Sequence, residues 1–211
     1  LAPNSVQEMH DFVADAFDLA FKYRNPAMIL ADGCIGQMME KVVLAPQRPR
    51  KTKEEIAAEC KSWALIGKTD DRERNVITSL ELKSEVMEVN NQRLQAKYRT
   101  LEENEVRYEA IQCDDAEYVI VAFGSSSRIC SATVEMARAE GIKLGLLRPI
   151  TLYPFPSKAI AALAERGVKG FLAAELNAGQ MVEDVRLAVN GKAPVEHYGR
   201  MGGMLFSRDE V

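Results

Sequence analysis

The stretch Tyr118–Phe123 reads YVIVAF and is followed directly by GSSSR at Gly124–Arg128. Six apolar residues in a row are typical of a strand that is buried on both faces, as in a parallel sheet. The glycine and serines then lead into a helix through Glu140, which Gly141 closes at the position after its C-cap. This strand–turn–helix unit predicts an α/β domain.

The same alternation continues to the end of the chain. We predict further strands at 142–147, 170–175 and 195–198. Between them, Pro156 and Ser157 open a helix that Gly167 closes, and a helix at 179–190 is closed by Gly191. Strands that alternate with helices of about 10–14 residues indicate parallel pairing through right-handed crossovers. The order of the strands cannot be read from this pattern.

The first 46 residues predict a helix, a strand and a turn. Ser5 can cap a helix whose apolar residues recur at helical spacing, with Glu8 three positions later as in a capping box. The short apolar run Ala27–Ala31 predicts a buried strand, and 32–36 is a glycine-bearing turn. The chain starts at Leu1 rather than Met, so we expect a piece of a longer polypeptide whose upstream residues supply the rest of this sheet.

The middle of the chain is polar. Residues 46–75 contain Pro46, Pro49 and many charges, and we predict a linker that wraps a surface. Residues 76–110 contain neither Gly nor Pro and predict one long helix. Apolar residues recur there every seven positions, but their companion positions are polar, so docking on a neighbouring domain or subunit is favoured over a self-associating coiled coil.

Composition narrows the class of protein. The 211 residues carry a net charge of -4 and are 47% hydrophobic, which suits a globular core and argues against nucleic-acid binding. No apolar run is long enough to span a membrane. The four cysteines are too far apart in sequence to suggest a zinc or iron–sulfur site, so we expect reduced thiols in a cytoplasmic protein and no metal site.

Several segments resemble the alpha subunit of 2-oxoacid:ferredoxin oxidoreductases, especially the 2-oxoisovalerate type. They are LAPNSVQEMHDFVADAFDLAFKYRNPAMILADGCIGQMMEKV at 1–42, AELNAGQMVEDVRLAVNG at 174–191 and HYGRMGG at 197–203. The stretch from Tyr118 to Pro156 looks like the opening of a transketolase C-terminal domain. The resemblance covers essentially the whole chain.

This resemblance implies a thiamine pyrophosphate enzyme that decarboxylates a 2-oxoacid, forms an acyl-coenzyme A and passes electrons through iron–sulfur clusters to ferredoxin. It implies partner subunits: a thiamine-binding beta subunit that holds the pyrophosphate and Mg²⁺, and gamma or ferredoxin-like subunits that carry the clusters. The glutamate that activates the aminopyrimidine would lie upstream of Leu1. We therefore expect no catalytic residue in this chain, and no activity from it alone.

The resemblance also implies a division of the chain. Residues 1–46 would be the end of the pyrimidine-binding α/β domain, and 47–114 a linker with the long amphipathic helix. Residues 115–211 would form a three-layer, parallel-sheet, transketolase C-terminal-like domain. These parts would supply a scaffold for assembly and contacts on the coenzyme A side.

The first candidate site is the turn Gly124, Ser125, Ser126, Ser127 and Arg128. Its N–H groups, hydroxyls and guanidinium lie at a helix N-terminus, where an anion such as a phosphate of coenzyme A is favourable. The alternative is that Ser126 or Ser127 only caps the helix, and this is favoured because the turn matches neither a Walker loop nor GxGxxG.

The second candidate site is Glu175, Asn177 and Gln180, at the end of a predicted strand where open α/β sheets place ligands. A hydrogen-bond cluster at a domain interface is favoured over helix capping and over ligand contact. Cys34 and His197 are read as structural, because no base can be placed beside the thiol and the histidine lies in a short strand.

Two other classes of protein stay open on the sequence. Transketolases and the beta chains of 2-oxoacid dehydrogenases share the C-terminal fold, although the long helix and the segments at 175–180 and 199–203 argue against them. A non-catalytic module that binds a phosphorylated ligand at Gly124–Arg128 is the third reading.

Overall fold

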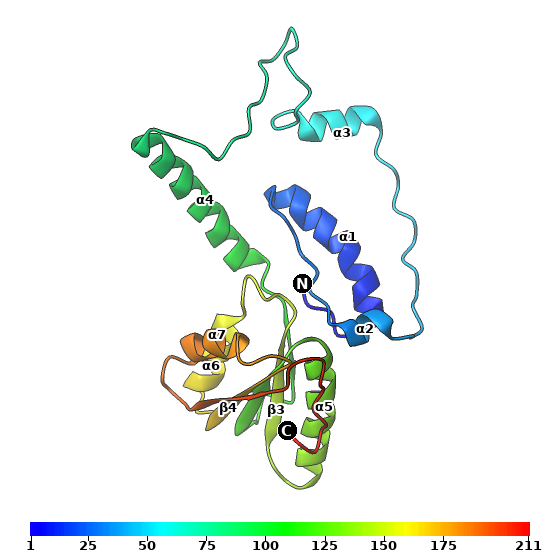
Figure 1. The fold of residues 1–211 in the computed structure, drawn as a ribbon, viewed down its shortest axis with the longest axis vertical. Helices are drawn as coiled ribbons and strands as arrows, with labels where there is room; N and C mark the ends of the chain where they lie inside the picture. Colours follow the sequence, from blue (N-terminus) through cyan, green and yellow to red (C-terminus); the bar gives the residue numbers. More distant parts are fainter. The chain divides into compact units, whose positions relative to one another are not determined.

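A computed structural model describes all 211 residues (Figure 1). Its helices are α1 (Val6–Tyr23), α2 (Gly33–Gln37), α3 (Lys53–Cys60), α4 (Ser84–Asn104), α5 (Gly124–Ala139), α6 (Ser157–Glu165) and α7 (Met181–Val189). Its strands are β1 (Tyr108–Ile111), β2 (Tyr118–Val121), β3 (Leu144–Pro149), β4 (Gly170–Glu175) and β5 (Val195–Gly199). The chain forms two compact units, one of residues 1–44 with 97–211 and the other of residues 45–96.

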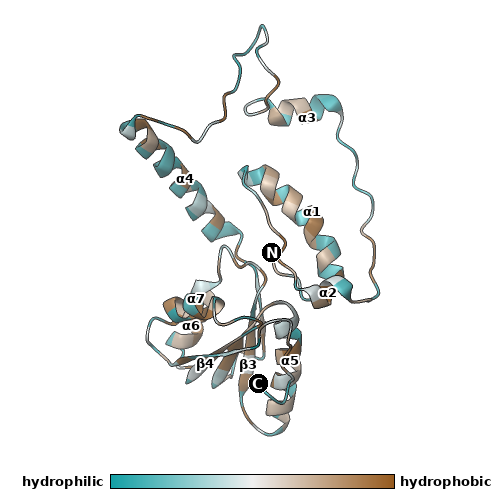
Figure 2. Ribbon diagram, viewed as in Figure 1, coloured by the Kyte–Doolittle hydropathy of each residue, from teal (hydrophilic) through white to brown (hydrophobic).

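The larger unit is built on a five-stranded sheet in the order β1-β3-β2-β4-β5. Strands β3, β2, β4 and β5 pair in parallel, and β1 joins β3 as an antiparallel edge. Brown, the colour of hydrophobic residues, prevails on β3 and β4 in Figure 2, whereas α4 is mostly teal. The hydrophobic run correctly predicted β2. Its residues are apolar because Val119, Ile120 and Val121 are all buried at the centre of the sheet.

Helices cover both faces of this sheet. Helix α5 packs on one face around Ile120, Cys130 and Val134, where Phe206 from the C-terminal segment completes the cluster. Helices α6 and α7 pack on the other face, around Val121 and Val185 (Figure 1). The predicted α/β class and its three layers around a mostly parallel sheet are therefore confirmed. The glycines after α5, α6 and α7 have the positive φ expected of helix ends: Gly141, Gly167 and Gly191.

The structure corrects three predicted elements. Residues 27–31 form no strand, because Leu1 alone pairs with this extended segment, through Leu1 N to Met28 O and Leu30 N to Leu1 O, each at 2.8 Å. The predicted linker contains α3, which a capping box between Thr52 and Glu55 starts. The helix predicted at 76–110 is shorter than expected, since α4 begins at Ser84 and β1 follows it as the edge of the sheet.

The smaller unit, 45–96, contains α3, a polar turn and the first part of α4. Arg72 holds the turn by donating to the carbonyl oxygens of Lys61 and Ala64, each at 2.8 Å. Cys60 is the one buried residue of this unit, so polar surface contacts rather than an apolar core define it. No helix of the protein is long and apolar enough to cross a membrane.

Candidate functional site

The turn that the sequence singled out, Gly124–Ser127, forms the buried first turn of α5. Phe123 occupies the N-cap and its side chain makes no cap bond. Neither Ser126 nor Ser127 caps the helix, and the Ser127 hydroxyl instead donates to Gly124 O at 2.7 Å. Gly124 adopts φ +59°, a conformation that side chains rarely allow. No side chain adjacent in sequence therefore caps the N-terminus of α5.

A carboxylate from a distant part of the chain occupies this position. Asp32 Oδ2 accepts from Ser125 N at 2.9 Å, and Asp32 Oδ1 accepts from the Ser125 hydroxyl at 2.8 Å. The same Oδ1 accepts from Ile35 N at 3.0 Å, because Asp32 is also the N-cap of α2. One carboxylate therefore caps two helices, as anions are stabilised at helix N-termini.

The hydrogen bonds change the acidity of Asp32. Partial burial by itself would raise the pKa of this carboxyl. The bonds from Ile35 N and from the Ser125 amide and hydroxyl outweigh burial, so the pKa of Asp32 lies below its usual value. The Asp32 side chain is therefore ionised in neutral solution.

Arg128, the last residue of the predicted anion loop, forms a second contact beside the first. Its Nη1 lies 2.7 Å from Glu40 Oε1 and donates to Asn4 O at 3.0 Å. Glu40 Oε2 also accepts from Val6 N at 2.9 Å, and these bonds lower the pKa of Glu40. The structure thus brings Gly124, Ser125 and Arg128 of the loop against segment 1–44.

A third contact was missed by the sequence reasoning. The Arg148 side chain on β3 is 3% exposed, and its Nη2 bonds to the Glu8 carboxylate of α1 and, at 3.4 Å, to Ala2 O. Its Nη1 pairs with Glu109 on β1 at 3.1 Å. An arginine inside an apolar strand was the available sign, because a buried guanidinium needs partners. The Nε atom of Arg148 has no hydrogen-bond partner. The Arg148 side chain also borders a polar cavity of about 360 Å³.

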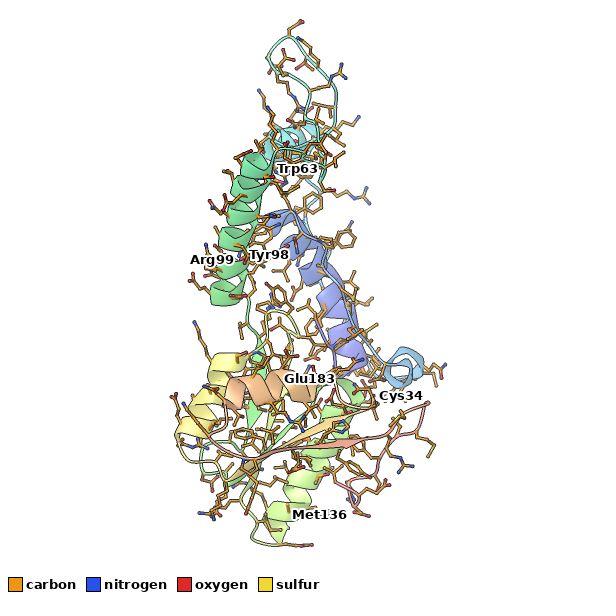
Figure 3. The ribbon with its side chains drawn as sticks, turned by 60° about the vertical axis from the view of Figure 1, so that its left-hand side comes forward. Cys34, Trp63, Tyr98, Arg99, Met136 and Glu183 are labelled. Atoms are coloured by element: carbon orange, nitrogen blue, oxygen red, sulfur yellow. The ribbon has the colours of Figure 1, made fainter.

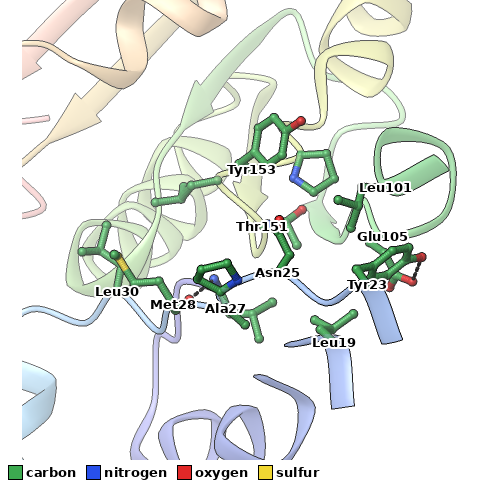
Figure 4. A pocket seen from close by; sticks show the side chains of 14 residues that line it. Leu19, Tyr23, Asn25, Ala27, Met28, Leu30, Leu101, Glu105, Thr151 and Tyr153 are labelled. Carbon is green, nitrogen blue, oxygen red and sulfur yellow. Dashed lines mark hydrogen bonds between the residues drawn. The ribbon is translucent and has the colours of Figure 1, made fainter. Parts of the chain in front are cut away.

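The end of α1 meets the end of α4 around a fourth cluster. Glu105 accepts from Lys22 Nζ at 2.6 Å. It also accepts from the Tyr23 hydroxyl at 2.5 Å, a bond drawn in Figure 4. Burial would raise the pKa of Glu105, but these two bonds outweigh it and the pKa is lowered. An apolar pocket of about 270 Å³ lies beside this cluster, lined by residues that include Leu19, Leu101 and Tyr153.

The second predicted site, around Glu175, lies at the end of β4 as expected. The Glu175 carboxylate is buried and accepts from Met181 N at 2.8 Å and Val182 N at 3.0 Å, at the start of α7. Asn177 donates to the same carboxylate at 3.1 Å, and Gln180 contributes only its backbone N–H, at 3.3 Å. The structure brings Glu175 and Asn177 together, and their partners all lie in the α/β domain.

Cys34 and His197 have no partners that would make them reactive. Cys34 is exposed on α2 (Figure 3). His197 Nε2 has no hydrogen-bond partner and lies 3.9 Å from Glu175 Oε1. No three His, Cys, Asp or Glu side chains converge as metal ligands would. The arrangement can hold two segments of chain together.

The fold and these contacts define an α/β protein in which a three-layer domain is held to a preceding helical segment. Four carboxylates make these contacts, of which Glu105 is buried and Glu8, Asp32 and Glu40 are half-buried. Two family profiles match this chain in succession. "Pyruvate flavodoxin/ferredoxin oxidoreductase, thiamine diP-bdg" matches residues 1–109, and "Pyruvate:ferredoxin oxidoreductase core domain II" matches residues 116–211. The chain belongs to the pyruvate flavodoxin/ferredoxin oxidoreductase family, as the motifs predicted.

Individual relatives agree with this family. Ketoisovalerate oxidoreductase subunit VorB from Methanothermobacter marburgensis is 48% identical over 211 residues, which cover 100% of this chain and 57% of VorB. 2-Oxoglutarate synthase subunit KorA from the same organism is 31% identical over 230 residues, with 61% of KorA covered. The chain thus spans less than two thirds of the length of these relatives.

One solved structure shares the fold over the whole chain. It is the 2-oxoglutarate:ferredoxin oxidoreductase from Magnetococcus marinus with 2-oxoglutarate, coenzyme A and succinyl-CoA bound. The TM-score is 0.75 at 18% identity, covering 100% of this chain and 40% of that one. At this identity the likeness concerns the fold alone.

Proposed function

We propose that this chain forms part of the alpha-type subunit of a thiamine-dependent 2-oxoacid:ferredoxin oxidoreductase, which converts a 2-oxoacid to an acyl-coenzyme A and reduces ferredoxin. The observation that carries the proposal is the succession of a thiamine-binding match and a core domain II match along one chain. The relatives carry different subunit names, VorB and KorA, so their names do not decide between alpha and beta. The alpha-type assignment rests on the two family profiles that match along the chain.

Within that enzyme the chain serves as scaffold. Residues 1–46 end the pyrimidine-binding domain, 47–114 link it, and 115–211 form core domain II. The contacts of Asp32, Glu40, Glu8 and Glu105 support this role, because each ties segment 1–44 to residues after 97. The chain supplies no catalytic residue, and its clusters of acids serve helix capping and pairing.

The substrate we propose is a branched 2-oxoacid of the 2-oxoisovalerate type. The relatives named for ketoisovalerate are 48% and 49% identical, whereas the KorA relatives named for 2-oxoglutarate reach 31% at most. The 48% and 49% identities extend along the whole chain, which supports this preference.

The cofactors and partners follow from the same proposal. Thiamine pyrophosphate and Mg²⁺ would be held chiefly by a beta subunit, and iron–sulfur clusters by gamma or ferredoxin-like subunits, in a cytoplasmic complex. The residues of this chain do not fit a metal or a cluster, because Cys60, Cys113 and Cys130 are buried apart and Cys34 stands alone at the surface. When bound, thiamine would supply the decarboxylation chemistry.

The test is an assay of the enzyme assembled from this subunit and its partner subunits. With coenzyme A and ferredoxin or a viologen acceptor, kcat/KM for 2-oxoisovalerate should exceed that for 2-oxoglutarate at least tenfold. The chain on its own should show no turnover. Equal use of both substrates would overturn the substrate class, and an assembled complex without any 2-oxoacid oxidation would overturn the function.

A further inference from the structure

The carboxylate of Asp32 sits in a site that is built for an anion. Three donors converge on it: Ser125 N at 2.9 Å, the Ser125 hydroxyl at 2.8 Å and Ile35 N at 3.0 Å. Asp32 and Ser125 are 93 residues apart in the chain, so this contact is tertiary. No local capping rule accounts for it, because Asp32 already caps α2 through Ile35.

The walls of the site are buried. Ser125, Ser126 and Ser127 are 6%, 3% and 1% exposed. A Cβ on Gly124 would lie 3.1 Å from Asp32 Oδ2, and φ +59° at that residue disfavours any side chain. Helix α5 is 16 residues long, so a full helix dipole points its positive end at the carboxylate. These features together set buried donors and the positive end of a helix against the carboxylate of Asp32.

We propose that Gly124 and Ser125 form an anion socket and that Asp32 is the positioning residue which fills it and fixes α2 on core domain II. Only the effect of this position on oxidoreductase activity rests on the proposed function. The existence of the socket is independent of that function. While Asp32 is in place, a phosphate of coenzyme A or another free anion has no access to these donors. Removal of the Asp32 side chain leaves a socket that small carboxylates fill.

The neighbouring contacts assign the central role to Asp32. The Arg128–Glu40 pair beside it has side chains 38% and 26% exposed, and Glu40 reaches only one helix N-terminus, through Val6 N of α1. Exposed pairs of this kind contribute little, because solvent and salt screen them. Asp32 is the residue through which two helix ends are satisfied at once, so its loss should free α2 first.

The test uses Asp32→Gly in the full chain, with formate as the probe and hydrogen–deuterium exchange as the readout. Amides of α2 and of Gly124–Ser127 should exchange at least tenfold faster in the variant. Formate at high millimolar concentration should slow them again in the variant and leave the wild type unchanged, while equal chloride does neither. Asp209→Gly is the matched control, since its carboxylate is exposed and contacts only Arg208, at 3.4 Å.

Two outcomes would overturn the socket: unchanged exchange in Asp32→Gly, or equal slowing by formate and chloride. If Asp32→Gly fails to fold by circular dichroism, Asp32→Asn replaces it, and the amide should give intermediate exchange without a response to formate. In the assembled enzyme, Asp32→Gly should lower kcat with KM for the 2-oxoacid unchanged, and formate should restore part of kcat. Since exchange is read without turnover, failure of the socket is distinguishable from failure of the proposed function.

Discussion

The buried guanidinium of Arg148 on β3 bonds to the carboxylate of Glu8 on α1, 140 residues earlier in the chain. Arg148 also pairs with Glu109 on β1, so one side chain ties the first helix to two strands of the sheet. Because the Arg148 side chain is 3% exposed, water cannot replace either partner easily.

Arg148→Met should therefore destabilise the protein. Removing one partner of a buried pair costs up to about 3–5 kcal/mol, and we expect roughly 2–3 kcal/mol because Glu8 and Glu109 can regain water. Urea denaturation measures the difference in the free energy of unfolding. Arg200→Met is the control, since Arg200 pairs with Glu210 at the surface and its loss should cost less than about 1 kcal/mol. Equal effects of the two changes would contradict a buried ion pair between Arg148 and Glu8.

Gly199→Ala should destabilise the end of the sheet. A Cβ at Gly199 would lie 2.2 Å from Asn177 O and 2.7 Å from the His197 ring, so backbone must move. Overpacking of this kind costs roughly 1–3 kcal/mol. Gly36→Ala is the matched control, because nothing lies within 4 Å of its Cβ position and alanine favours the helical conformation of α2. The midpoint of thermal unfolding should be lower for Gly199→Ala than for Gly36→Ala. A Gly199→Ala midpoint equal to that of the wild type would refute the close approach.

Acid should weaken the contacts that Asp32 and Glu105 make between segment 1–44 and the residues after 97. The pKa values of Asp32 and Glu105 are lowered in the folded protein from 3.8 and 4.5. A folded pKa below the unfolded one means that these carboxylates stabilise the protein above the unfolded value. That stability disappears as the pH falls from about 5 through the folded pKa. Unfolding midpoints measured from pH 7 to pH 3 should decline less steeply in Asp32→Asn.

Asp184 provides the comparison of opposite sign. Partial desolvation of the carboxyl of Asp184, an exposed residue, together with the charges of Glu183 and Glu175, raises the pKa of Asp184 above 3.8. A raised pKa means that the charged form destabilises the folded state once the pH passes the folded pKa. Asp184→Asn should therefore stabilise the protein at pH 7 and have little effect at pH 3. The opposite order of effects would show that Asp184 has a compensating partner.

The thiols should react in a set order. Cys34 is exposed, whereas Cys60, Cys113 and Cys130 are buried. Burial raises the pKa of Cys130 to about 12, so on the order of one molecule in ten thousand carries its thiolate at pH 8. A disulfide reagent followed by mass spectrometry should modify Cys34 first and Cys130 last. Cys34→Ser should remove the fast phase, and early modification of Cys130 would contradict its burial between α5 and the sheet.

Much of the α/β domain could be predicted from local pattern. The apolar run of β2 and the ends of β4 needed only the rule that a central parallel strand is apolar on both faces. Gly141 and Gly191 marked helix ends because a positive φ follows from the geometry of a helix terminus. By contrast, β1 lay in a polar stretch that reads as helix, since an edge strand takes its structure from the neighbour with which it pairs.

The candidate site was found only in part. Its loop, Gly124–Arg128, was predicted because glycine and serines at a helix start are suited to an anion. Which anion it holds depends on Asp32, whose own sequence context indicates nothing more than a turn before α2. Glu175 was likewise located at the end of β4, yet its role as a cap for α7 depends on how the following turn brings three N–H groups back to it.

The sequence by itself determined the family, the alternation of strands and helices, and the residues that begin and end them, because these depend on side chains within a few positions of one another. The tertiary structure decided that Asp32 meets Ser125 and that Arg148 meets Glu8. Such contacts join residues about a hundred positions apart, and a carboxylate that caps a distant helix has the same local sequence as one that faces water.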